Sequence, residues 1–374
     1  MKDTFAIIYA GHGNPLLGDL IAHRAVSALP LAGRYRTIDV LLTNVVQSGI
    51  RDVGVIMQRN FQSLVEHIGP GDAWDLNSKS GGVALLTPFD QGLGTGIYRG
   101  FGDALFAKRY YLERQHSKYC LLLASDMVYR DDYTRMLEHH EATGADITML
   151  YSRELRLGLG DPTHLANLHI DESGWVRGFD FEPYGLEGGC YNLGASIMEK
   201  DLLLRLVEDA CAEGRYNFVS DIIEPALATH KVAALEHTGY SSRLTTVKSY
   251  YDMMRDTLDK DVRQELFYEH GHVYTRVMDA PPVRYVKGCQ VENSVFGNGC
   301  VVEGNVTGSV VFRGVTIEKG ANVENCVIMQ DSHIGAGACL RNVIIDKNVI
   351  VGPDARLVGT PDSQLVVRKG SIVE

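Results

Sequence analysis

The carboxyl-terminal part of the chain repeats with a period of 17 residues, and this repeat constrains the fold more than any other feature. Segments 306–322, 323–339 and 340–356 align without a gap. Four columns of the alignment keep their residue type: Val311, Ile328 and Ile345; Ile317, Ile334 and Val351; Gly335 and Gly352; Ala338 and Ala355. One coil cannot bury its own apolar face, so such units must stack. Hairpins would not keep a gapless register, and we therefore predict a β-helix of three-strand coils with glycine or asparagine at the corners.

The first half of the chain follows another rule, in which apolar runs alternate with helical spacing. Strands are expected at 5–9, 53–57, 119–124 and 146–151, and helical patterns cover 103–113, 132–143, 201–223 and 247–270. This alternation indicates a parallel sheet covered by helices on both faces. Ligands of such sheets bind beyond the carboxyl ends of strands, where Ala10-Gly11 and Ser125-Asp126 stand. The rigid Ala280-Pro281-Pro282-Val283 segment divides the prediction into domains 1–279 and 280–374.

Composition excludes several classes of protein. The formal net charge of the 374 residues is −11, and an acidic surface of this kind repels nucleic acid. No run of about 18 apolar residues is present for a membrane span, and the amino terminus lacks the layout of a signal peptide. Seven scattered cysteines without a C-x-x-C pair favour neither a zinc ribbon nor a disulfide framework. We therefore expect a cytoplasmic protein with no membrane or nucleic-acid partner.

Several local motifs together resemble the glucose-1-phosphate adenylyltransferase family, over nearly the whole chain. They are Arg24-Ala25, Gly33-Arg34-Tyr35-Arg36-Thr37-Ile38-Asp39, Asn44 with Ser48-Gly49-Ile50, Tyr98-Arg99-Gly100 with Asp103-Ala104, Ser125-Asp126-Met127-Val128-Tyr129, and Asp221-Ile222-Ile223-Glu224-Pro225. Family enzymes convert ATP and glucose-1-phosphate to ADP-glucose and diphosphate in glycogen biosynthesis. The resemblance implies an α/β fold: an N-terminal Rossmann-like (GT-A-like) mixed-sheet domain, followed by a left-handed parallel β-helix of hexapeptide repeats. It also implies a tetramer.

The resemblance weakens at the positions that bind phosphate. The family's phosphate loop A-G-G-x-G-x-R-L corresponds to residues 10–17, where only Gly11 stays in register. His12 and Asn14 replace glycines, and Leu16 replaces the arginine. The family's R-A-K-P corresponds to residues 24–27, so Val26 replaces a lysine. A plain turn is therefore favoured over a phosphate-binding loop.

The other two departures concern the sugar phosphate and the metal ion. Glu182, in Phe181-Glu182-Pro183, replaces the lysine of the family's E-K-P. Asp126 matches the family's catalytic Mg²⁺-binding aspartate, although a retained turn or helix-cap residue explains it equally well. The second carboxylate should come from W-R-D-V-G-T, which we align with residues 242–247, so that Leu244 takes the ligand position. We expect no required cofactor, with residual Mg²⁺ binding left open.

Other family positions are kept. Gly11, Tyr98, Arg99, Gly100 and Asp103 match residues that line the substrate cleft, although Phe101-Gly102 replaces Thr-Ala. The cationic residues of the family's effector site correspond to Arg24, Arg36 and Lys347. Basic side chains from two domains can bind a phosphorylated effector, and the alternative is three ordinary surface cations.

The chain keeps the family's fold-defining motifs but lacks its phosphate-binding and metal-binding residues. In this respect it resembles the GlgD-type regulatory subunit, a non-catalytic relative that partners a catalytic subunit. We therefore expect a catalytically defective subunit in a hetero-tetramer or homo-oligomer. One alternative is an active nucleotidyltransferase with a rearranged loop that uses Arg34 or His12 with Asp126. Another is a hexapeptide acyltransferase that uses His333, and a third is a scaffold without a ligand.

Overall fold

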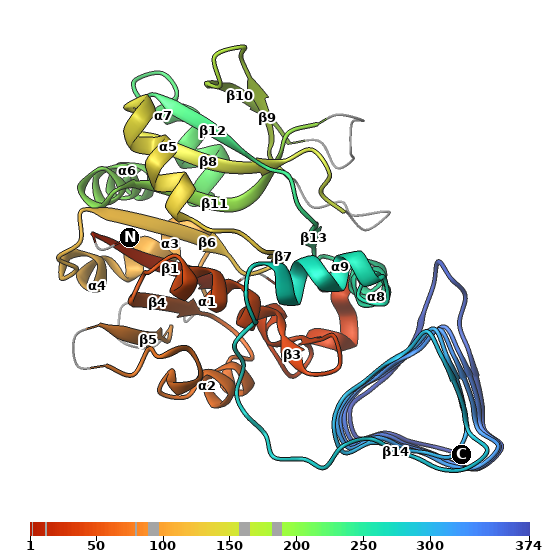
Figure 1. Ribbon diagram of the computed structural model, residues 1–374. Coiled ribbons are helices and arrows are strands. Elements are labelled where there is room, and N and C mark those ends of the chain that lie inside the picture. The colour runs from red at the N-terminus through yellow and green to blue at the C-terminus, as the bar shows by residue number, and fades with distance from the viewer. Residues whose placement is uncertain (2, 12, 79–80, 89–96, 157–164, 182–188) are drawn as a thin grey trace.

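The computed structural model describes residues 1, 3–11, 13–78, 81–88, 97–156, 165–181 and 189–374, which form a sheet domain and a triangular prism (Figure 1). A nine-stranded mixed sheet is the centre of the first domain, with the order β10-β9-β11-β6-β1-β4-β5 and with β8 joining β11 to β12. Its strands are β1 (Thr4–Ala10), β4 (Asp52–Met57), β5 (Gly82–Leu86), β6 (Tyr119–Ala124), β8 (Ile147–Ser152), β9 (Asn167–Ile170), β10 (Val176–Asp180), β11 (Tyr191–Glu199) and β12 (Val232–His237). The four strands expected from the sequence are present, and the antiparallel β11 makes the sheet mixed.

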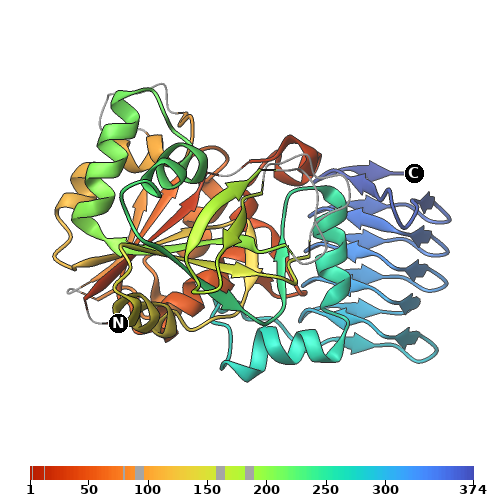
Figure 2. The ribbon, with the colours of Figure 1, turned by 90° about the horizontal axis from the view of Figure 1, so that it is seen from above.

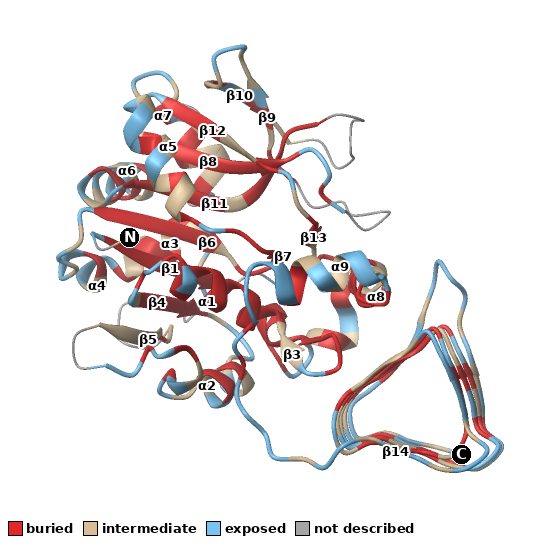
Figure 3. Ribbon diagram, viewed as in Figure 1, coloured by how far each residue is buried: buried red, intermediate tan, exposed pale blue. Residues whose placement is uncertain are grey.

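Helices cover both faces of this sheet because successive residues of a buried strand point to opposite sides. Ala6 and Ile8 of β1 pack in one apolar cluster with α1, α2 and α5, whereas Phe5, Ile7 and Tyr9 pack in another with α3, α4 and α6. The helices are α1 (Thr37–Gln47), α2 (Gln62–Ile68), α3 (Phe101–Ala107), α4 (Arg109–Glu113), α5 (Thr134–Thr143), α6 (Lys200–Ala212) and α7 (Glu224–Ala226). Figure 3 shows the sheet as an almost continuous buried layer.

The longest predicted helices are interrupted. In the 201–223 segment, α6 ends before Gly214, whose φ of 76° is unsuited to a helix, and a π-helix follows at Phe218–Ile223. The 247–270 segment divides into α8 (Val247–Asp256), α9 (Lys260–Gln264) and a π-helix (Glu265–Glu269). Asp259 caps α9 by accepting from the Asp261 backbone, which starts a new helix in a new direction. Helical spacing continues across both breaks, so periodicity alone does not reveal them.

Short elements complete the sheet domain. The β-strands are β2 (Pro30–Leu31), β3 (Tyr35–Arg36), β7 (Met127–Tyr129) and β13 (Ser241–Arg243), and 3₁₀ helices lie at Pro15–Ile21, Val26–Ala28 and Asp72–Trp74. β13 pairs antiparallel with β7 directly after β6. No helix in the described part of the chain has the length and apolar character needed to cross a bilayer.

The second domain is the β-helix expected from the 17-residue repeat. Its strands form three parallel sheets, one on each side of the prism. They are β14 (Arg284–Tyr285), β15 (Gln290–Glu292), β16 (Val295–Phe296), β17 (Val301–Val302), β18 (Asn305–Thr307), β19 (Val310–Val311), β20 (Thr316–Ile317), β21 (Asn322–Glu324), β22 (Val327–Ile328), β23 (His333–Ile334), β24 (Cys339–Arg341), β25 (Val343–Ile345), β26 (Ile350–Val351), β27 (Arg356–Val358), β28 (Leu365–Val367) and β29 (Ile372–Val373). Val311, Ile328 and Ile345 are register partners, which confirms the repeat columns. Asn325 and Asn342 occupy one corner with a φ of 51° each, a conformation that asparagine tolerates.

The two domains share one apolar core, so the prism is fastened to the sheet domain. Val40, Tyr250 and Met253 pack in the same cluster as Phe312 and Met329 of the prism. Figure 2 shows α8 lying along the prism at this boundary. The hydroxyl of Tyr251 on α8 donates to the backbone oxygen of Asn325 at 2.8 Å. β13 pairs with β7, which directly follows β6, and α8 follows β13 in the chain. The boundary between the domains is therefore connected through β13 to the carboxyl end of β6.

Candidate functional site

A cavity of about 690 Å³ opens beyond the carboxyl ends of β1 and β6, where the sequence predicts ligand binding. This volume lies within the range of about 300–1,000 Å³ that is typical of small-molecule sites. Gly11, Tyr98, Arg99, Gly100 and Asp126 line it together. Asp103 does not line it but lies on α3 directly behind Arg99. We call this cavity the cleft.

Aromatic rings form one wall of the cleft. Tyr9 stacks on Phe101 with centroids 4.6 Å apart, and Phe101 contacts Phe218 at 5.4 Å. Gly102 allows this packing because its backbone nitrogen donates to the Tyr216 carbonyl at 2.9 Å, too close for a side chain. The Phe101-Gly102 pair, which departs from the family pattern, therefore builds the wall.

Arg99 is held by two neighbours. Its guanidinium and backbone nitrogen bind Asp103, with Nη2–Oδ1 at 3.1 Å and N–Oδ2 at 2.9 Å. The guanidinium also lies 3.5 Å from the centre of the Tyr216 ring. Asp103 thus positions Arg99 at the rim of the cleft.

The Asp126 carboxylate binds an arginine. Asp126 lies in the turn between β6 and β7, and its Oδ2 accepts from Nε of Arg243 on β13 at 3.0 Å. Their side chains are only 6% and 13% exposed, and both residues line the cleft. Asp126 is therefore a turn residue rather than a helix cap, and its charge is compensated inside the protein.

The prediction that Leu244 stands in the metal-ligand position is wrong. Leu244 is buried in the core shared with the prism, and its backbone nitrogen donates to the Asp126 carbonyl at 2.8 Å. Arg243 is the residue that faces Asp126. Thr246 caps α8. If the final threonine of W-R-D-V-G-T is aligned with Thr246, the aspartate of the pattern, three residues earlier, falls on Arg243. The threonine at the start of the predicted helix was therefore the signal that would have corrected the alignment.

The cleft does not suit a divalent cation. Mg²⁺ requires several oxygen ligands in near-octahedral geometry. Among the described residues that line the cleft, Asp126 is the one carboxylate, and Arg243 already engages it. A divalent cation would therefore have to compete with the Arg243 guanidinium for this single ligand.

The segment after β1 forms a turn and a short helix. The Asn14 side chain accepts from the Leu16 backbone at 3.1 Å and caps the 3₁₀ helix at Pro15–Ile21. Leu16 is exposed and lies outside the cleft, whereas Gly13 lines it. Val26 is buried in the core. His12 and Glu182 lie outside the described residues, although Phe181 lines the cleft.

The three predicted effector residues meet at the boundary between the domains. Arg24 is buried and binds both oxygens of Asp346 on the prism, at 2.7 and 2.9 Å. Arg36 donates to the Ser63 carbonyl at 2.6 Å, and burial lowers its pKa. Lys347 follows Asp346 in the chain, and we call Arg24, Arg36 and Lys347 the boundary cations.

Positive charges lie close together among the boundary cations, and this affects the protonation of Lys347. Burial lowers the pKa of Lys347 to about 7, and the positive charges of Arg36 and Arg24 contribute to this shift. The Asp346 carboxylate acts in the other direction and raises the pKa of Lys347, but it is already bound by Arg24. A bound anion would relieve this repulsion and restore the proton on Lys347.

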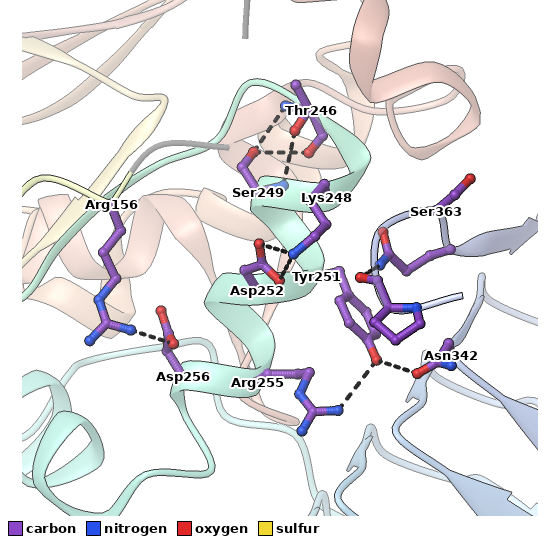
Figure 4. Close-up of polar contacts among 12 residues, drawn as sticks. Arg156, Thr246, Lys248, Ser249, Tyr251, Asp252, Arg255, Asp256, Asn342 and Ser363 are labelled. Atoms are coloured by element: carbon purple, nitrogen blue, oxygen red, sulfur yellow. Dashed lines mark hydrogen bonds and ion pairs between the residues drawn. The ribbon is translucent and has the colours of Figure 1, made fainter. Parts of the chain in front are cut away.

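Two residues that the enzymatic alternatives require, His333 and Arg34, lie outside the cleft. His333 on β23 pairs with Glu318 on the prism surface at 3.1 Å. Arg34 lies over the ring of Tyr35 and does not line the cleft. A second hollow, beside α8, contains Arg156 paired with Asp256 and Lys248 paired with Asp252 (Figure 4). Both of its carboxylates are already paired with a cation, and its third cation, Arg255, donates to the Tyr251 hydroxyl, so the cleft is the stronger candidate site.

Sequence reasoning missed several cleft residues that come from β11 and from the segment before α7. They are Asn192, Gly194, Ser196, Asn217, Phe218 and Ser220. Gly194 has a φ of 69° and lies against Ala124 of β6, which bends β11 at the cleft. A glycine inside an apolar strand was the available signal.

Comparisons with known proteins agree with this architecture. Residues 6–260 match the nucleotidyl transferase family, and residues 281–364 match the GlmU-like C-terminal hexapeptide family. The fold and the cleft thus define a nucleotidyl transferase-type domain joined to a hexapeptide β-helix.

Relatives along the whole chain narrow the assignment. A glucose-1-phosphate adenylyltransferase of Thermomicrobium roseum is 34% identical over 361 residues, which cover 96% of this chain and 84% of the relative. One from Bacillus cytotoxicus is 31% identical over 94% of this chain and 92% of the relative, and one from Bacillus mycoides is 30% identical over 98% and 94%. The chain belongs to the glucose-1-phosphate adenylyltransferase family.

Proposed function

We propose that the chain is a regulatory, catalytically defective subunit of glucose-1-phosphate adenylyltransferase, of the GlgD type, acting in the cytoplasm in glycogen biosynthesis. The assembly is a hetero-tetramer with a catalytic subunit or, alternatively, a homo-oligomer. The observation that carries this proposal is the Asp126–Arg243 pair in the cleft.

Nucleotidyl transfer depends on cations that stabilise charge developing on the α-phosphorus. Arg243 stands where the family pattern has a carboxylate, and it engages the carboxylate that remains. Leu16 and Val26 replace two phosphate-binding cations, and neither faces the cleft. Each such loss commonly costs about 2.7–4 kcal/mol of transition-state stabilisation, or roughly 10²–10³-fold in rate. Together they support a cleft that binds without turnover.

The boundary cations support the regulatory part of the proposal. Three basic side chains from two domains lie near one another, and burial together with the charges of Arg36 and Arg24 lowers the pKa of Lys347 to about 7. A phosphorylated metabolite is the kind of ligand that guanidinium and ammonium groups bind well. Binding at a domain boundary affects a partner subunit only through a coupling free energy between the two sites.

The test uses the purified full-length chain with ATP, glucose-1-phosphate and Mg²⁺. We expect ADP-glucose formation at least about 10⁴-fold below that of a catalytic relative assayed in parallel, given the rate losses above. Co-expression with the catalytic subunit of the same organism should yield a mixed complex with altered substrate affinity or effector response. Robust turnover by the isolated chain, or an unchanged catalytic subunit in the mixture, would overturn the proposal.

A further inference from the structure

The Arg243 guanidinium is one of the charged groups that line the cleft, with those of Arg99 and Asp126. Its Nε donates to Asp126 at 3.0 Å, and its Nη1 is buried without a hydrogen-bond acceptor among the described residues. Buried donors of this kind are uncommon in native proteins and often mark a binding function. The arginine therefore keeps hydrogen-bonding capacity beyond the one bond to Asp126.

The fold holds this arginine firmly in place. β13 pairs with β7 so that Arg243 is the register partner of Met127, next to Asp126. Three residues later Thr246 caps α8 through a reciprocal pair of hydrogen bonds with Ser249, each at 2.9 Å (Figure 4). Strand pairing on one side and a capped helix on the other restrict the backbone of Arg243. A preorganised guanidinium loses little entropy when it binds an anion.

Charge balance at this place explains how a metal ion becomes dispensable. Two carboxylates with a divalent cation have no net charge, and neither does one carboxylate with one arginine. The guanidinium presents planar donors that match phosphate oxygens, a task that a bound Mg²⁺ would otherwise perform. Replacing an acidic residue by Arg243 therefore removes the metal site and supplies a phosphate-binding group in one step.

The remaining cleft residues indicate the rest of the ligand. The stacked rings of Tyr9 and Phe101 offer an apolar wall, and Asn192, Ser196 and Asn217 offer polar groups around it. A cavity of about 690 Å³ accommodates a molecule of nucleotide size. A phosphorylated nucleotide or nucleotide sugar combines these features.

We propose that Arg243 binds the phosphate of a nucleotide or nucleotide sugar in the cleft directly, with Asp126 as its positioning residue, so that binding needs no divalent cation. The inference rests on the proposed function, since a subunit relieved of turnover does not need a metal ion to stabilise a transition state.

The experiment is calorimetric titration of the full-length chain with ADP-glucose, and separately with ATP, in EDTA and in millimolar Mg²⁺. We expect saturable binding of at least one ligand with dissociation constants that agree within about twofold between the two conditions. R243Q should weaken binding by about 10–100-fold in EDTA, because a charged hydrogen-bonding group is lost. Binding that requires Mg²⁺, an unchanged R243Q, or no saturable binding of either ligand would overturn the inference.

Two further variants separate a role in binding from a role in folding. R243D restores the second carboxylate, so nucleotide binding should become dependent on Mg²⁺. In R243Q the Asp126 carboxylate is released, and Mg²⁺ should partly restore affinity, whereas R243Q combined with D126N should lose this response. A merely structural arginine would leave the Mg²⁺ response of all three proteins unchanged, and that result would also overturn the inference.

The control is Arg341→Gln, which removes an arginine paired with Glu324 on the prism surface. It makes the same change of charge outside the cleft, and its nucleotide binding should equal that of the parent chain. Turnover distinguishes the two proposals. ADP-glucose formation by the isolated chain would defeat the proposed function, whereas Mg²⁺-dependent binding without turnover would defeat this inference alone.

Discussion

The cleft and the boundary cations differ in how their charged side chains are paired. At the cleft the lining carboxylate Asp126 binds Arg243, and Asp103, which lies behind the rim, binds Arg99. At the boundary Asp346 is already bound by Arg24, and burial and repulsion from Arg36 and Arg24 lower the pKa of Lys347 to about 7. The first arrangement is neutral by itself. The second leaves Lys347 beside two cations, so the proposed effector binding and the proposed nucleotide binding can be tested at separate places.

Arg24→Ala should produce the largest effect on stability. It leaves the buried Asp346 carboxylate without its partner, and breaking such a pair costs about 3–5 kcal/mol. Urea unfolding measures this loss. Arg177→Ala, which removes an exposed pair with Asp171, should change the free energy of unfolding by less than about 1 kcal/mol. Equal effects of the two variants would mean that the boundary pair does not bind the domains together.

Gly102→Ala tests the cleft wall. An added Cβ would lie 2.8 Å from the Tyr216 carbonyl and 2.7 Å from the Ile222 side chain, so the backbone must shift. We expect a loss of about 1–3 kcal/mol in the free energy of unfolding, together with weaker nucleotide binding. Gly178→Ala is the matched control, because Gly178 does not line the cleft and its added Cβ would make an ordinary contact of 3.4 Å with the His169 side chain. A stable Gly102 variant with normal binding would show that the wall tolerates displacement.

The pH dependence of anion binding tests the boundary cations. Below pH 7 Lys347 is protonated and attracts an anion, and above pH 7 it loses its proton. Affinity for a probe such as fructose bisphosphate should therefore fall by up to about fivefold between pH 7 and 8, as the protonated fraction of Lys347 falls. Lys347→Met should bind more weakly at pH 6 and lose this pH dependence. An identical pH profile in the variant would assign the proton to another group.

The same group makes a prediction about stability. Unfolded Lys347 keeps its proton up to its ordinary pKa of 10.5, whereas the folded protein releases it near pH 7. The unfolded state thus binds more protons between these values, and the contribution of Lys347 to stability rises with pH across that window. Thermal unfolding of the parent chain and Lys347→Met from pH 6 to 9 measures the difference, which should shrink as the pH rises.

Tyr251→Phe should have the smallest effect. It removes the hydroxyl that donates to the Asn325 carbonyl on the prism, at a cost of about 0.5–1.5 kcal/mol. Nucleotide binding in the cleft should be unchanged, because Tyr251 lies on the prism side of α8 (Figure 4). A change in cleft affinity would instead show that α8 couples the two regions.

The β-helix, which depends on a pattern of residues close together in the sequence, was predicted correctly, whereas two helix ends and one motif alignment were not. The β-helix could be predicted because each coil must bury the same apolar positions against the next coil. Val311, Ile328 and Ile345 therefore recur at the same position of the repeat. Helix ends at Gly214 and Asp259 were not readable from periodicity, since apolar spacing continues across them. Leu244 was misplaced by one position because a motif was aligned without knowledge of the helix start at Thr246.

By itself the sequence determined the fold of the two parts of the chain and the family, because these properties depend on local pattern and residue type. Tertiary structure decided which side chains meet. Arg243 and Asp126 are 117 positions apart, and Arg24 and Asp346 are 322 apart. Pairing between charges so distant in the chain depends on strand register and domain docking, and only the assembled core fixes those to within the length of a hydrogen bond.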